Sequence, residues 1–157
     1  MGVEVGVQTV ATLVTNDAVK GGGAGAGIEG SLALLRNASN THALFARMRT
    51  SLLVGDGLAY TVEAGAAWRL SLLPRYEPEL GVYLLYMGGD LARTIDRDGY
   101  LAENPWAILG GLTPLRFALD DGWVSFCAPR LGTTLGTSSG HPALAVSVSL
   151  FEVGRTF

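Results

Sequence analysis

The sequence predicts an all-β fold, an eight-stranded antiparallel up-and-down transmembrane β-barrel, with residues 1–157 forming a single barrel domain. Two runs of strict apolar and polar alternation, residues 42–54 and 58–72, flank a Gly-Asp-Gly turn, which is a strong β-hairpin signal. Each run is longer than the usual globular strand of about five or six residues, whereas a tilted strand of about 9 to 11 residues crosses a bilayer. The chain has room for about eight such strands.

The composition excludes several classes of protein. Charged residues make up 16% of the chain, against about 25% in ordinary soluble domains. Lys20 is the only lysine among the 11 basic residues, and a net charge of −3 without a basic patch argues against nucleic acid as a partner. Cys127, the single cysteine, excludes an internal disulfide. No run of about 18 apolar residues is free of glycine, charge or turn signals, so a transmembrane helix is not expected.

Alternation predicts the other strands, and glycine and proline predict where they are interrupted. Pro114 predicts a bulge or break in the sixth strand, and Pro129 is expected to cut the seventh short. A change of phase near Phe151 predicts a bulge in the last strand. The glycine-rich residues 16–25 are expected to form a loop. The remaining strands are predicted over residues 3–15, 26–36, 80–87, 106–119, 123–130 and 144–157.

The predicted connections differ in length according to the end of the barrel at which they lie. Those after the odd-numbered strands include the long segments 16–25, 88–105 and 131–142, whereas those after the even-numbered strands are short. In an antiparallel barrel all odd connections lie at one end, opposite both termini. Long loops at one end and short turns at the other are typical of outer-membrane barrels, and these three segments are where an envelope protein partner is expected to bind.

Charge placement predicts which face of the strands points inward. The polar faces of the clearest strands carry a nearly balanced set of Glu and Arg, separated by small residues. Such a set suits pairing inside a narrow, filled barrel, with membrane lipid touching the other face. The predicted interior ion-pair network comprises Glu4, Glu29, Arg47, Arg49, Glu63, Arg69 and Arg116, and Gln8 is placed to join it.

Aromatic residues fall near both ends of the predicted apolar band, as in the two girdles of a membrane barrel. The alternative is that they are core residues of a soluble, ligand-binding β-barrel. The predicted girdle residues are Tyr60, Tyr86 and Trp106 near the long loops, and Trp68, Phe117 and Phe157 near the termini.

In strand number, loop asymmetry and the terminal Phe157, the whole chain resembles the small eight-stranded outer-membrane proteins of the OmpA and OmpX kind. In that family the last strand presents alternate apolar residues to the assembly machinery. Val153 and Phe157 fit this pattern, and Arg155 departs from it. The resemblance implies a bacterial outer-membrane location, extracellular long loops and a plugged interior. Because the first residues lead directly into a strand, the chain is expected to be a mature form without its signal peptide.

Some barrels of this kind act on lipid A, so a lipid A hydrolase is an alternative. Its candidate residues do not form a recognisable pattern, and the His-x-Ser sequence of outer-membrane deacylases is absent because Ala143 follows His141 at that spacing. We therefore expect no catalytic residues. The candidates are His42, Ser138, Ser139, His141 and Glu152.

No cofactor or metal is expected either. Asp90, Asp96 and Asp98 lack the spacing of a calcium loop, and the glycines of 21–27 are followed by neither a Lys-Ser/Thr pair nor a helix. Glu63 beside Arg47 and Arg49 could form a gate, but a structural ion-pair network is favoured.

The sequence thus predicts an integral outer-membrane barrel with a structural, adhesive or complex-scaffolding role, exerted through its long extracellular loops. The alternatives are a narrow pore, a lipid-modifying outer-membrane enzyme, and a soluble ligand-binding β-barrel.

Overall fold

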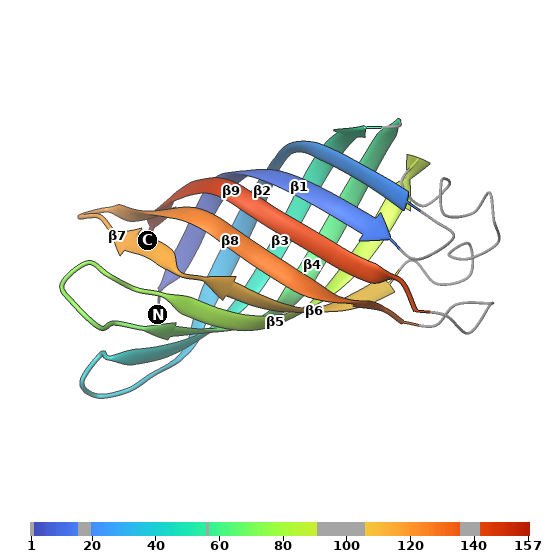
Figure 1. Cartoon of the computed structure of the whole chain (residues 1–157). Helices are drawn as coiled ribbons and strands as arrows, with labels where there is room; N and C mark the ends of the chain where they lie inside the picture. Colours follow the sequence, from blue (N-terminus) through green and yellow to red (C-terminus); the bar gives the residue numbers. More distant parts are fainter. Residues whose placement is uncertain (1, 16–19, 56, 91–105, 136–141) are drawn as a thin grey trace.

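The computed structural model describes residues 2–15, 20–55, 57–90, 106–135 and 142–157. The strands follow one another around a barrel (Figure 1). They are β1 (Val3–Thr15), β2 (Lys20–Arg36), β3 (His42–Gly55), β4 (Leu58–Leu70), β5 (Glu79–Gly89), β6 (Trp106–Thr113), β7 (Leu115–Ala118), β8 (Gly122–Thr134) and β9 (Leu144–Thr156).

Antiparallel pairing closes the sheet into a barrel of eight strands, if β6 and β7 are counted as one. Each of β1 to β5 pairs with the next strand along the chain. The strands β6 and β7 both pair with β8, β8 pairs with β9, and β9 returns to pair with β1. Pro114 separates β6 from β7, so these two short strands together form one interrupted strand of the barrel. The interruption lies where the sequence predicts a break. The predicted eight-stranded antiparallel barrel is thereby confirmed.

The two ends of the barrel differ. Both termini and the connections 37–41, 71–78 and 119–121 lie at one end, which we call the turn end (Figure 1). We call the opposite end, where β1, β3, β5 and β8 end, the loop end. At the turn end the 71–78 connection extends the barrel wall beyond β5, because Glu77 N donates to Arg116 O at 2.9 Å and Ala118 N donates to Arg75 O at 2.7 Å.

The glycine-rich segment corrects one sequence prediction. Residues 20–25 are not part of a loop but the first part of β2, where Val14 pairs with Gly21 and Leu53 pairs with Gly25. A Cβ atom on Gly25 would collide with the Leu52 carbonyl oxygen on the neighbouring strand. These glycines allow the backbones of neighbouring strands to approach closely. A glycine-rich composition alone does not show whether such a segment is a closely packed strand or a flexible loop.

The β8 strand corrects a second prediction. It continues past Pro129 to Thr134, so the predicted 131–142 loop begins several residues later. Pairing is irregular two residues earlier, where Cys127 has a φ of 52° and stands opposite Leu150, which is unpaired with β1. Leu150 is therefore the bulge predicted near Phe151. Proline cannot donate to the ladder, and it is tolerated next to such an irregularity because the regular hydrogen bonding is already interrupted there.

Large apolar side chains cover the outside of the barrel and charged side chains lie inside it. Ile28 and Val82 are 61% and 62% exposed, whereas Arg49 is 3% exposed. This is the reverse of a water-soluble barrel, in which charged side chains face solvent. No helix in the described ranges has the length and apolar character needed to cross a membrane.

Candidate functional site in the barrel interior

Among the described residues, the barrel interior holds ten charged side chains, five glutamates and five arginines, each between 1% and 5% exposed. The seven residues of the predicted ion-pair network are among them. Glu79, Arg130 and Glu152 complete the set. Their inward position follows from strand alternation, because each lies on the concave face of its strand.

Five of these residues form a turn-end cluster: Glu4, Arg47, Arg69, Glu79 and Arg116. Arg69 donates to both oxygens of Glu4 at 2.7 Å, and Arg116 donates to the same carboxylate at 2.9 Å. Glu79 accepts from Arg69 at 2.6 Å and pairs with Arg47 at 2.7 Å and with Arg116 at 3.2 Å. Each carboxylate is thus shared between two or three guanidinium groups, which offsets part of the cost of burial.

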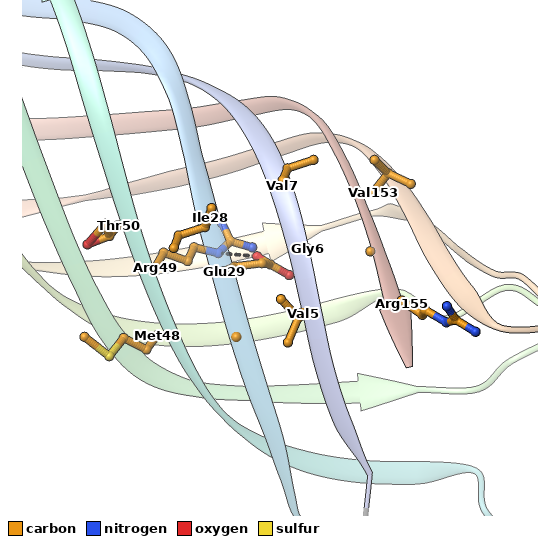
Figure 2. A pocket seen from close by; sticks show the side chains of 12 residues that line it. Val5, Gly6, Val7, Ile28, Glu29, Met48, Arg49, Thr50, Val153 and Arg155 are labelled. Carbon is orange, nitrogen blue, oxygen red and sulfur yellow. Dashed lines mark ion pairs between the residues drawn. The ribbon is translucent and has the colours of Figure 1, made fainter. Parts of the chain in front are cut away.

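The other five form a central cluster: Glu29, Arg49, Glu63, Arg130 and Glu152. Arg49 pairs with Glu29 at 2.6 Å and with Glu152 at 2.8 Å, and Figure 2 shows the first of these contacts. Arg130 pairs with Glu63 at 3.1 Å and lies 3.8 Å from Glu152. The central cluster therefore links β2, β3, β4, β8 and β9 across the barrel.

Neutral polar side chains extend the central cluster. The Ser149 hydroxyl accepts from Arg49 and Arg130, each at 3.3 Å, and donates to Gln8 at 2.8 Å. Gln8 in turn donates to Ser51 at 3.2 Å. Gln8 is therefore connected to the charged residues through Ser149.

Three arginines also rest on aromatic rings inside the barrel. The guanidinium carbon of Arg69 lies 3.9 Å from the centre of the Phe45 ring, that of Arg116 lies 4.1 Å from the Trp123 ring, and that of Arg130 lies 4.9 Å from the Tyr83 ring. These distances are within the range of cation–π contacts. Each of these three guanidinium groups therefore contacts an aromatic ring in addition to its carboxylate partners.

In addition to the residues of the predicted Arg/Glu network, an apolar layer lies in the loop-end half of the interior. Its most deeply buried large aliphatic members are Val14, Leu53, Leu85, Met87 and Leu109, each at most 2% exposed. The second face of the predicted fifth strand, with Leu85 and Met87, was the sequence signal for this layer. The described interior thus contains two layers of different chemistry.

The three interior charges missing from the sequence prediction have local explanations. Glu79 precedes the predicted start of its strand by one residue, and Arg130 ends a strand that was expected to stop at that position. Glu152 follows the bulge at Leu150, which moves it onto the inward face. Extending the alternation of the fifth strand by one residue would have found Glu79, whereas Arg130 follows the irregularity at Cys127, where the inward-facing parity of β8 changes.

The six predicted girdle residues lie on the outside of the barrel. At the loop end, the Tyr86 ring is 6.1 Å from Tyr60 and 4.9 Å from Trp106. At the turn end, Trp68 and Phe117 are exposed and Phe157 is 70% exposed. The 71–78 connection adds Tyr76, whose ring lies 5.7 Å from Phe117.

The candidate catalytic and metal-binding residues are not brought together within the described part of the chain. His42 lies at the turn end, with its ring 6.0 Å from Trp68. Glu152 belongs to the central cluster and accepts a hydrogen bond from Ser125. No group of three or more His, Cys, Asp or Glu residues suited to a metal is found among the described residues. Ser138, Ser139, His141, Asp96 and Asp98 lie outside them.

An apolar exterior around a closed, charged interior defines the class: this is an eight-stranded transmembrane β-barrel. No protein-family model matches the chain, and no curated protein sequence matches it.

Solved structures match the fold over the whole chain. Neisserial surface protein A (NspA) is 12% identical, with a TM-score of 0.61 over 99% of this chain and 97% of that one. Ail, the attachment invasion locus protein of Yersinia pestis, is 8% identical, with a TM-score of 0.55 over 99% of this chain and 98% of that one. A second structure of Ail, in complex with the heparin analogue sucrose octasulfate, has a TM-score of 0.51 at 9% identity, over 99% of this chain and 98% of that one. The chain therefore has the fold of these small surface barrels.

Proposed function

We propose that the chain is an integral barrel of the bacterial outer membrane that acts through its loop end, as an adhesive or structural surface or as a scaffold for an envelope complex. The observation that carries this proposal is the filled interior. The apolar layer and the two charged clusters place large buried side chains along the interior of the described barrel, which supports a barrel that does not conduct solutes. What the barrel can offer to a partner is then its rim and its loops.

The apolar exterior and its two aromatic girdles support the membrane part of the proposal. Side chains such as Leu52, Val82 and Leu131, each close to 60% exposed, would be unfavourable in water, at about 25 cal/mol for each Å² of apolar surface. The outer membrane is where bacterial barrels of this fold reside.

Charge distribution indicates what kind of partner the loop end suits. The ten interior charges balance, as do the six at the turn end, so the net charge of −3 belongs to the loop-end connections and the residues that border them. The turn-end residues are Arg36, Arg75 and Arg155 against Glu77, Asp120 and Asp121. The other charged residues of the sequence belong to the segments between β1 and β2, β3 and β4, and β5 and β6, or border them: Lys20, Arg93 and Arg97 against Asp17, Asp56, Asp90, Asp96, Asp98 and Glu103.

An acidic loop end favours a cationic partner surface over a sulfated one. Ail was solved with a heparin analogue, a polyanion. For this chain we propose the opposite preference. We also propose that it is not an enzyme, because neither His42 nor Glu152 lies in a nucleophile and base arrangement within the described residues.

Two measurements test the proposal. In planar bilayers the refolded chain should show no single-channel conductance, whereas steady conductance steps would favour the narrow pore. Lipid A mass spectrometry should show no change when the chain is expressed, whereas a loss of acyl chains would favour the lipid-modifying enzyme.

Adhesion tests the partner. Bacteria that display the chain should bind a polylysine-coated surface more than a heparin-coated one. The triple variant D96N/D98N/E103Q, which removes the excess negative charge at the loop end, should lose this preference. The matched variant D120N/D121N alters the turn end and should keep it. Equal binding of both surfaces by the unmodified chain would contradict a cationic partner.

A further inference from the structure

Arg155 is a charged residue on the outside of the barrel wall. It lies on β9 near the turn end, pairs with Val5 of β1 in the sheet, and has its guanidinium carbon 5.6 Å from the centre of the Phe157 ring. Within the described part of the chain Arg155 makes no ion pair. It thus stands at the level of the turn-end girdle, where lipid headgroups meet the hydrocarbon.

A groove in the outer surface begins beside Arg155. It has a volume of about 750 Å³ and runs across β9, β1, β2 and β3 (Figure 2). This volume falls within the range of about 300 to 1,000 Å³ that is usual for ligand sites. The outward side chains along it are Val5, Val7, Ile28, Met48, Thr50 and Val153.

Gly30 gives the groove its depth. It occupies an outward position on β2, between Val5 of β1 and Met48 of β3 in the sheet. A Cβ atom at this position would meet only the Glu4 carbonyl oxygen, at 3.9 Å, which is an ordinary van der Waals distance. The space above Gly30 is therefore open, and a larger side chain could occupy it without moving the backbone.

The chemistry of the groove decides between the two occupants that a membrane offers. A second copy docked around a two-fold axis through this face would bring two Arg155 side chains toward each other, which is unfavourable in a medium of low dielectric constant. A phospholipid has an apolar chain and an anionic phosphate at the interface, which matches an apolar groove with a guanidinium at its interfacial end.

We propose that this groove binds one acyl chain of an anionic phospholipid in the leaflet at the turn end, with the lipid phosphate held by Arg155. The proposal rests on the membrane-spanning barrel and is independent of what the loops bind. It also gives a role to the residue that departs from the apolar pattern of the terminal strand.

Native mass spectrometry of the full chain, released from detergent micelles, tests the proposal with phosphatidylglycerol and phosphatidylcholine as competing probes. We expect one phosphatidylglycerol to be retained, with a preference of about fivefold over phosphatidylcholine, the size expected for one arginine at an anionic surface. Arg155→Gln should abolish the preference, and Gly30→Leu should abolish retention of either lipid by filling the groove.

Gly110 provides the matched control. It faces outward on β6 in a second depression, lined by Leu80, Leu112, Pro129 and Leu131, with the nearest backbone contact of a Cβ atom also at 3.9 Å. Gly110→Leu should leave phosphatidylglycerol retention unchanged. Heat-dependent mobility on a gel confirms that each variant is folded, independently of lipid binding. Equal retention of the two lipids by the unmodified chain, or an equal loss in the Gly110 and Gly30 variants, would overturn the proposal.

Discussion

Arg69 and Glu4 face each other across the barrel interior, with Nη1 and Nη2 of the guanidinium each 2.7 Å from a different carboxylate oxygen. Arg69 belongs to β4 and Glu4 to β1, and these strands are not neighbours in the sheet. The pair therefore joins two walls of the barrel directly, in addition to the backbone ladder. Because both groups are buried, removing either one would leave the other as an uncompensated charge. The contribution of each group to stability therefore depends on the presence of its partner.

Glu79→Gln should be strongly destabilising. The Glu79 carboxylate is shared by Arg47, Arg69 and Arg116, so its neutralisation leaves excess positive charge in a buried site. Breaking such a buried interaction costs about 3–5 kcal/mol. The free energy of unfolding in urea, measured in lipid vesicles by tryptophan fluorescence, should fall by an amount in this range.

Asp120→Asn is the control for that measurement. Asp120 pairs with Arg75 at 2.8 Å, but the two side chains are 88% and 66% exposed. An exposed ion pair contributes about 0–1 kcal/mol. Similar losses in the two variants would show that burial does not govern the energetics of the interior network.

Depth in the membrane should determine the cost of a charge on the outer face. Leu84 lies at the middle of β5 and is 39% exposed, whereas Leu73 lies beyond β4 at the turn end and is 65% exposed. Leu84→Arg should destabilise the folded barrel by about 2–4 kcal/mol in vesicles, and Leu73→Arg by about 0–1 kcal/mol. A soluble barrel would tolerate both changes, so equal and small effects would contradict the membrane orientation.

The alternation of apolar and polar residues was sufficient to predict the barrel because each strand has one face toward lipid and one toward the interior. In residues 42–54, Arg47 and Arg49 share a parity that no side chain from a distant strand can change. The outward position of the girdle residues Trp68 and Trp106 follows in the same way from the alternation in their own strands. The face of the barrel wall on which a residue lies could therefore be predicted from the sequence of its own strand.

Features that depend on contact between strands could not be predicted from the sequence of one strand. Gly25 looks like a loop residue by composition, and only the close approach of the Leu52 carbonyl oxygen shows why a strand needs glycine there. The inward position of Glu152 depends on a bulge at Leu150, whose length cannot be counted from one sequence. The sharing of Glu79 among three arginines likewise depends on the register of four strands.

Gly6 should tolerate no larger side chain, in contrast to Gly30. A Cβ atom on Gly6 would lie 2.9 Å from Cζ2 of Trp123 and 2.9 Å from the Val153 carbonyl oxygen. Because Trp123 is fully enclosed, it has no free space into which to move. Gly6→Val should cost about 1–3 kcal/mol by overpacking, whereas Gly30→Val should be neutral. Refolding yields on gels without boiling, followed by urea titration, provide the comparison.

Cys127 offers a direct probe of which solvent touches the outer face. Its side chain is exposed on β8, between the turn-end girdle and the middle of the strand. In lipid vesicles the thiol should be protected from a charged, water-soluble maleimide, because the hydrocarbon excludes the reagent. After unfolding in urea it should be labelled fully. A Cys127→Ser variant gives the background, and rapid labelling of the folded protein in vesicles would show that water, and not lipid, covers this part of the wall.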